Sequence, residues 1–240
     1  RRDYYSFIRN RFFILCGIQV FSNKGLPLKM ILRAFEKKDR DALRQIACNT
    51  AFLGLPYQLF IDDKEILADA LTVYFTDYEP ESCFVAEENE KIVGYLIGTK
   101  NAQKMNGIFK QKIFPQLFKK TLLSGIIFQK NTFIFLRNLL QSLVKGEFLA
   151  PDFSLKYPAL LHINIAQDFR GQKIGERLIN HYLNFLKENN ISAVHLGTMS
   201  ENAKEFFQKC GFMILFQGHR SYLKNHLKKN ASYYILGRAV

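Results

Sequence analysis

The chain has 240 residues, of which 48% are hydrophobic and 23% are charged. This balance excludes a disordered polymer and is typical of a globular protein near the upper size of a single domain. Four cysteines occur, at positions 16, 48, 83 and 210, without a CxxC pair or a Cys/His cluster at metal-ligand spacing. We therefore expect reduced thiols, a cytoplasmic location and no metal site.

The formal net charge of +13 is unevenly distributed. Basic residues outnumber acidic ones by six to one in residues 1–29 and by nine to two in residues 101–158, whereas residues 30–100 contain eight basic and thirteen acidic residues. Neither basic segment contains a nucleic-acid-reading motif, so we expect no nucleic-acid partner. Both segments are also rich in apolar residues, and peripheral membrane contact through either of them is one interpretation.

Residues 1–29 are expected to form an extension that precedes the compact domain. Several arginines come before a ten-residue apolar run, Phe12–Phe21, which is followed by Ser-Asn-Lys-Gly. This order resembles a signal peptide or a short anchor, but ten residues are too few to span a bilayer as a helix. A peripheral anchor and a packed or disordered extension remain equal alternatives. We expect one domain over residues 30–240.

From Met30 the sequence pattern predicts regular elements. Apolar residues recur at helical spacing after Asp39, a residue type that caps helix starts, and the turn Glu88-Asn89-Glu90 separates two apolar strand segments. The expected elements are a strand at Met30–Phe35, helices at Arg40–Thr50 and Lys64–Tyr74, and a β-hairpin formed by Ser82–Glu87 and Lys91–Thr99.

Residues 101–158 are predicted to be a helical insertion. Phe109, Ile113, Leu117 and Phe118 have the spacing of one amphipathic helix, and Phe133–Val144 forms another. One interpretation is that these helices pack on the core with solvated lysines. The other is that they form a lid or a membrane-facing element.

The remaining residues predict a strand, a turn and alternating helices and strands. Leu161, Ile163 and Ile165 alternate with polar residues, as in a half-buried strand. A glycine-bearing turn at 170–175 then leads into a helix, and the predicted later elements are strands at Ala193–Leu196, Phe212–Phe216 and Tyr233–Leu236 with a helix between Ser200 and Gly211. The fold class is therefore α/β: a mixed central sheet flanked by helices, with the insertion between the third and fourth strands.

The turn at 170–175 is the strongest candidate binding site. Backbone N–H groups at a helix start attract anions, and the side chains of Arg170 and Lys173 add positive charge. Arg170 through Gly175 resembles the pyrophosphate motif Arg/Gln-x-x-Gly-x-Gly/Ala of the GNAT superfamily of acetyltransferases. Residues 202–212, Asn-Ala-Lys-Glu-Phe-Phe-Gln-Lys-Cys-Gly-Phe, resemble the family's Asn-x-Ala…Phe-Tyr-x-x-x-Gly-Phe pattern, and residues 31–39 resemble its opening strand.

The resemblance covers residues 30–100 and 159–240 and implies a GNAT fold that uses acetyl-CoA as co-substrate. Residues 194–197, Val-His-Leu-Gly, are further similar to the acetyltransferase-like domain joined to O-GlcNAcases. The resemblance implies direct transfer of an acetyl group to an amine of a small molecule, an amino sugar or a lysine-like acceptor. The cofactor-binding residues that it implies are Ile163, Ile165, Arg170, Gly171, Gln172, Lys173, Ile174, Gly175, Asn202 and Phe207.

Two positions depart from the family pattern. Lys173 stands where the motif has its first glycine, and we expect a helical backbone there. Phe207 stands where the family has a tyrosine that protonates the leaving thiolate, and a phenyl ring cannot donate a proton. An acyl-CoA-binding module without catalysis is therefore an alternative function.

His162 is the best candidate for a general base, because an unperturbed histidine has a pKa of about 6.5. It is expected to share a strand face with Asn164, which could orient a water molecule, on the side opposite Leu161, Ile163 and Ile165. A structural histidine beside the cleft is the alternative. His195, on the next strand, is expected to be structural.

Overall fold

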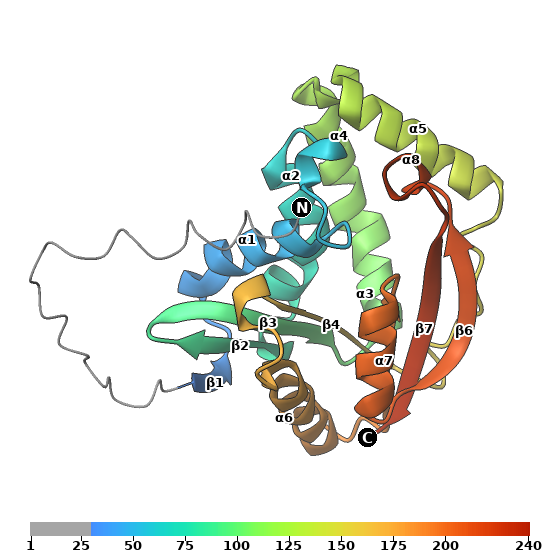
Figure 1. Ribbon diagram of the computed structural model, residues 1–240. Coiled ribbons are helices and arrows are strands. Elements are labelled where there is room, and N and C mark those ends of the chain that lie inside the picture. Colours follow the sequence, from blue (N-terminus) through green and yellow to red (C-terminus); the bar gives the residue numbers. More distant parts are fainter. Residues whose placement is uncertain (1–29) are drawn as a thin grey trace, which may run out of the picture.

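The computed structural model describes residues 30–240, so the expected N-terminal extension at 1–29 lies outside the described residues. A single seven-stranded sheet with the order β1-β2-β3-β4-β5-β7-β6 runs through the molecule (Figure 1). Only β4 and β5 are parallel neighbours, and the other pairs are antiparallel, which confirms the mixed sheet. The strands are β1 (Met30–Ala34), β2 (Cys83–Glu88), β3 (Lys91–Thr99), β4 (Ala159–Ile165), β5 (Ala193–Thr198), β6 (Met213–Arg220) and β7 (Ala231–Ala239).

The helices of the described chain follow the expected order. α1 has the predicted bounds, whereas α2 ends one residue early and continues as a π-helical turn at Tyr74–Tyr78. The α-helices are α1 (Arg40–Thr50), α2 (Lys64–Val73), α3 (Ala102–Ile108), α4 (Phe114–Leu123), α5 (Lys130–Val144), α6 (Ile174–Glu188), α7 (Glu201–Lys209) and the short α8 (Lys224–Leu227).

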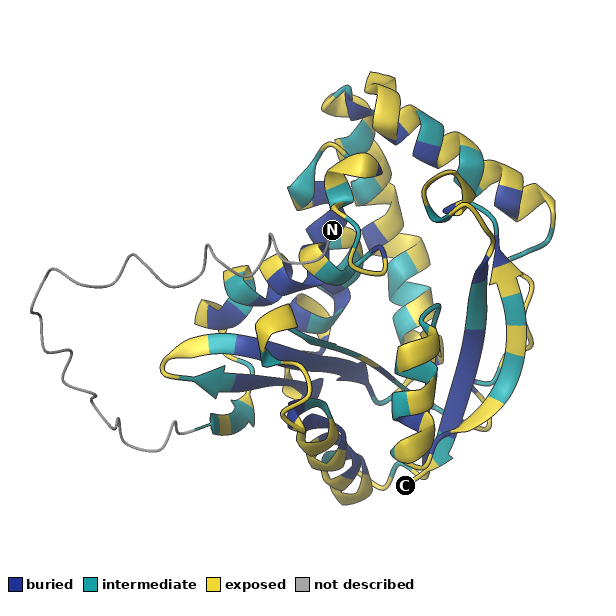
Figure 2. Ribbon diagram, viewed as in Figure 1, coloured by how far each residue is buried: buried dark blue, intermediate teal, exposed yellow. Residues whose placement is uncertain are grey.

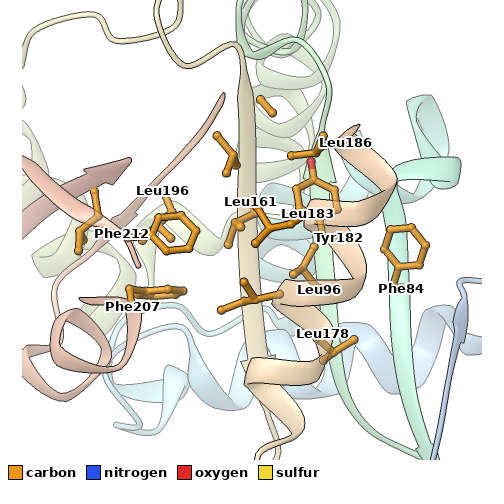
Figure 3. Packing of buried hydrophobic residues seen from close by; sticks show 14 of the residues in the cluster. Phe84, Leu96, Leu161, Leu178, Tyr182, Leu183, Leu186, Leu196, Phe207 and Phe212 are labelled. Carbon is orange, nitrogen blue, oxygen red and sulfur yellow. The ribbon is translucent and has the colours of Figure 1, made fainter. Parts of the chain in front are cut away.

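Helices cover both faces of the sheet. α6 packs on β2, β3 and β4, and its inward side chains join the largest core cluster of the described chain (Figure 3). Tyr182 is central to this packing, because its hydroxyl donates within the core to the carbonyl groups of Thr99 and Leu160. α1 and α2 cover the opposite face, where Leu43 and Ile46 pack against side chains of β2 and β3.

The helical insertion lies between β3 and β4, as predicted. Its first predicted helix is longer than expected, because α3, a π-helical turn at Phe109–Ile113 and α4 follow one another without a break. α4 packs on α2. α5 then crosses to α8 (Figure 1), and Phe135 packs there against Phe52, Phe60 and Tyr222.

Two buried carboxylates hold the ends of the insertion. Glu79 accepts hydrogen bonds from three hydroxyl groups and from the backbone N–H of Lys100, at 2.7 Å, just before α3. Beyond α5, Glu147 accepts from Ser142 and from the backbone N–H of Ser221, at 2.6 Å, at the end of β6. Burial opposes ionisation of Glu147, but these donors outweigh it and lower its pKa. The insertion is therefore fixed to the sheet at both ends.

Candidate functional site

The centre of the sheet contains an opening between β4 and β5. These strands pair only where Ala159 faces Val194 and Leu160 faces His195. Beyond this point β4 continues to Ile165 along β3, while β5 continues along β7. The two strands therefore part toward their carboxyl ends, although β4 is the fourth of seven strands.

Backbone groups of β4 face this opening. In an antiparallel ladder, hydrogen-bonded and non-hydrogen-bonded pairs alternate, and here the N–H of Ala166 donates to the carbonyl of Val93. The N–H and C=O groups of Ile163 and Ile165 therefore point away from β3. Within residues 30–240 they have no strand partner on that side, because the pairing with β5 has already ended. They form an unpaired strand edge inside the sheet.

The turn after β4 brings a helix start to the same edge. α6 begins at Ile174, and its N-cap residue, Lys173, makes no side-chain hydrogen bond to the first turn. The first backbone N–H groups of α6 therefore remain available to an anion. Gly171 has a φ of 81°, and an added Cβ would meet nothing within 4 Å. Arg170, Gly171, Gln172 and Lys173 are all exposed.

Lys173 and Arg170 have distinct roles in this turn. Lys173 has φ 60° and ψ 11°, so its backbone lies in the left-handed region. We expected a helical backbone at this position, and its handedness is the opposite of that in an ordinary α-helix. This conformation explains why the family motif has glycine at the position, since only glycine adopts it without strain. Arg170 donates through Nε to the carbonyl of Ile165, at 3.2 Å, and so ties the turn to the open edge of β4.

Gly175 is required by packing rather than by the turn itself. An added Cβ would lie 3.0 Å from Cζ of Phe206 on α7, which is closer than most real contacts. The small residue thus lets the start of α6 approach α7. The motif glycine sets the distance between these two helices.

His162 and Asn164 lie together, as predicted, on the face of β4 opposite Leu161, Ile163 and Ile165. Nδ2 of Asn164 donates to the hydroxyl of Tyr95, at 2.7 Å, and lies 3.0 Å from Nε2 of His162. With the amide oriented in this way, Nε2 accepts and the imidazole proton resides on Nδ1. Tyr95 is fully buried, whereas His162 is exposed.

The surroundings of His162 change its acidity. Although its side chain reaches solvent, the surrounding protein desolvates it and lowers its pKa to about 4. Desolvation disfavours the imidazolium ion, so this pKa lies below the 6.5 of an unperturbed histidine. His162 is neutral at physiological pH.

Three other predicted residues occupy clear positions. Asn202 is exposed in the first turn of α7, beyond the cap Ser200, whose hydroxyl accepts from Ala203 N–H. Phe207 is only 5% exposed and packs edge-on against Phe212, so its ring belongs to the core. Nδ1 of His195 lies 2.8 Å from the carbonyl of Tyr157, which fits the structural role expected for it.

Sequence reasoning missed Tyr95, which partners Asn164. It lies in the second strand of the β2–β3 hairpin and is aligned with Asn164 across the β3–β4 ladder. The register of that ladder would have revealed the pair, but the long insertion hides it.

Comparison with known proteins agrees with this geometry. Residues 142–212 match the model of the acetyltransferase (GNAT) family. This segment contains β4, the turn, α6, β5 and α7, and therefore most of the site. A search of curated proteins gave no significant match.

Solved structures share the fold at low sequence identity. The crystal structure of SsHAT is 22% identical with a TM-score of 0.65, and the match covers 88% of this chain and 98% of that one. The yncA protein from Salmonella typhimurium, solved with its cofactor acetyl-CoA, is 14% identical with a TM-score of 0.53, covering 88% and 93%. The polyamine N-acetyltransferase of Drosophila melanogaster is 14% identical with a TM-score of 0.52, covering 88% and 100%.

At these identities the structures establish the fold, and the family model matches the segment that contains most of the candidate site. The suggested likeness to the domain joined to O-GlcNAcases stays a prediction. This chain has the GNAT fold, and its residues 142–212 match the model of the acetyltransferase (GNAT) family.

Proposed function

We propose that this protein transfers an acetyl group from acetyl-CoA directly to an amine, carried by a small molecule, an amino sugar or a lysine-like group. The observation that carries the proposal is the coincidence of an unpaired strand edge with an uncapped helix start. Both belong to one strand–turn–helix unit, formed by β4, the turn at 170–175 and α6.

The residues present fit this co-substrate. The backbone of Ile163 and Ile165 offers hydrogen bonds to the amide groups of a pantetheine arm. The N–H groups from Gly171 to Gly175, with the charges of Arg170 and Lys173, suit a pyrophosphate. Asn202 on α7 flanks the same region, and the thioester supplies an activated acetyl group.

The acceptor would approach from the face of β4 that carries His162. At neutral pH its imidazole is uncharged, so Nε2 can receive the ammonium proton once an amine replaces Asn164 as its partner. Asn164 then orients the amine or a water molecule and remains bonded to Tyr95. A low pKa makes His162 a weak base, and we expect slow turnover.

No acid is assigned to the leaving thiolate. Phe207 has no acidic proton and is buried, and a CoA thiolate needs less protonation than an alkoxide or amide leaving group. The resemblance to polyamine and agmatine acetyltransferases supports an amine acceptor, because those proteins share the fold.

Steady-state CoA release over a panel of amines tests the proposal. We expect acetyl-CoA-dependent release with at least one polyamine or amino sugar, and a decrease of about 10²-fold or more in kcat for His162→Ala. Binding of acetyl-CoA, measured by calorimetry, should be unchanged in that variant, since His162 lies on the other face of β4 from the turn. A variant with full kcat would remove His162 from the mechanism.

The second candidate, a non-catalytic acyl-CoA-binding module, is favoured by the core position of Phe207 and the low pKa of His162. It predicts micromolar acetyl-CoA binding without turnover of any amine. Charge reversal by Arg170→Glu and Lys173→Glu should weaken binding under both functions. Unchanged affinity in these folded variants would place the acyl-CoA site elsewhere.

A further inference from the structure

Helix α5 turns its apolar side toward solvent. Its buried residues are Thr132, Phe135 and Ser142, two of which are polar. Its exposed apolar residues recur at spacings of three and four, which places them along one stripe of the helix. This stripe consists of Phe133, Leu136, Leu140, Leu143 and Val144, and Val144 is 81% exposed.

The apolar exposure continues into α4 and the connecting turn. On α4, Phe114, Phe118 and Leu122 lie four residues apart and are exposed, with the two phenyl rings stacked 6.4 Å apart. Leu123, the last residue of α4, is 78% exposed, and Phe128, in the connecting turn at 124–129, is 83% exposed. Figure 2 shows that α5 and this turn form an outer edge of the molecule. Isolated exposed apolar residues are common, but two helical stripes joined by such a turn indicate an interaction surface.

The charge of this surface is uniformly positive. Residues 101–146 contain eight basic residues and no acidic one. Among the ion pairs of the described residues, only Lys120 of this set has a carboxylate partner, Asp69 at 2.8 Å. Lys119, Lys130, Arg137 and Lys145 lie beside the stripes and are exposed. Apolar stripes bordered by unpaired cations are typical of elements that lie in the interface of an anionic membrane.

We propose that α4, the connecting turn and α5 bind the surface of a membrane that contains anionic phospholipids. The phenyl and leucyl side chains would enter the headgroup boundary, and the basic residues would contact lipid phosphates. A second copy of this chain would present the same positive surface and be repelled, and residues 1–29 are also basic, with six basic residues and one acidic residue. An anionic membrane is therefore favoured as the binding partner over a second copy of the chain and over residues 1–29.

None of the described helices is long and apolar enough to cross a membrane, so the contact would be superficial. It is also compatible with the fold, because the inward side of α5 already packs against Phe52, Phe60 and Tyr222. This inference does not depend on the transfer reaction.

Sedimentation of the full chain with large lipid vesicles tests the proposed membrane binding. One set of vesicles contains phosphatidylcholine alone, and the other contains phosphatidylcholine with phosphatidylglycerol at a ratio of about 7:3. We expect binding to the anionic set, weakened by salt. The variants Lys119→Gln and Arg137→Gln should each lower the partition coefficient by about fivefold. Phe128→Ser with Leu140→Ser should lower it by about tenfold or more.

Matched control variants make the same kinds of substitution on other parts of the described surface. Lys187→Gln and Lys209→Gln remove the same charge from α6 and α7, and Met213→Ser removes an exposed apolar side chain from β6. These controls should bind like the wild type, and circular dichroism should show that every variant is folded. Three results would overturn the proposal: no anionic preference, equal losses in the controls, or unchanged binding in the insertion variants, which would assign binding to residues 1–29. A dimer that the insertion variants dissociate would identify a second copy as the occupant instead.

Discussion

Helices α5 and α6 each have fifteen residues and an amphipathic sequence, yet α6 buries its apolar face and α5 exposes most of its own. α6 buries six side chains, among them Ile174, Leu178 and Leu186, against the sheet. α5 buries three, of which two are polar, and leaves its apolar stripe in solvent. An amphipathic pattern thus predicts that a helix has an apolar face, but not that the chain itself covers that face.

The largest expected difference between the two helices concerns leucine deletion. Leu178→Ala on α6 removes a fully buried side chain and should lower the free energy of unfolding by about 3 kcal/mol. Leu140→Ala on α5, where the residue is 61% exposed, should change it by no more than about 0.5 kcal/mol. Urea denaturation measures both. Comparable losses of unfolding free energy in the two variants would show that the protein itself covers the apolar face of α5, and the contrast with α6 would then be wrong.

A hydroxyl added to a phenyl ring sharpens the same contrast. Phe207→Tyr, in the core cluster that α6 shares with α7, should cost about 1–2 kcal/mol, because the hydroxyl enters apolar surroundings. Phe133→Tyr on the stripe of α5 should be nearly neutral. We expect Phe207→Tyr to change kcat by less than tenfold, since the thiolate leaving group needs little acid catalysis. A larger gain in rate would place residue 207 at the leaving sulfur.

Glycine substitution compares the start of α6 with the middle of α5. Lys173→Gly relieves a left-handed backbone and should raise the free energy of unfolding by up to about 1 kcal/mol. Arg137→Gly, in ordinary helical geometry, should lower it by about 1 kcal/mol. Thermal or urea unfolding provides the readout. A loss of stability in Lys173→Gly would mean that the lysine side chain stabilises the turn.

A dependence of stability on pH is also expected. The pKa of His162 is about 4 in the folded protein and near 6.5 when unfolded, so the unfolded chain binds more protons between these values. The free energy of unfolding should therefore fall as pH decreases from about 6.5 to 4. His162→Gln should flatten this slope, although His195, whose pKa burial also lowers, keeps part of it. An unchanged slope would mean that His162 is solvated like an ordinary surface histidine.

Much of the fold was predictable because its signals are local. The spacing of apolar residues located α1, and the turn at 88–90 located the β2–β3 hairpin, where Asn89 and Glu90 adopt positive φ. The cap expected from Asp39 was wrong, because its carboxylate makes no hydrogen bond to α1 and accepts from Arg33 and from the N–H of Glu36 instead. The turn at 170–175 could be proposed as an anion site because glycine, charge and a helix start are adjacent in the sequence.

The rest of the site depends on distant contacts. The pKa of His162 follows from how much protein surrounds it, and the link from Asn164 to Tyr95 depends on strand register across an insertion of more than fifty residues. The role of Gly175 depends on Phe206, which comes from another helix. These are properties of packing, and residue spacing does not encode them.

The short pairing between β4 and β5 has a consequence for cooperativity. Strands β1–β4 and β5–β7 are joined in the sheet through two residue pairs, whereas β5 and β7 share six. Each group can therefore open as a separate unit in native-state hydrogen exchange, with the amides of Ile163 and Ile165 among the less protected positions of the central strands. A ligand that forms hydrogen bonds with both β4 and β5 would couple the two groups of strands, so that they open together. Its binding would then raise the free energy of the opening reaction that exposes the least protected amides.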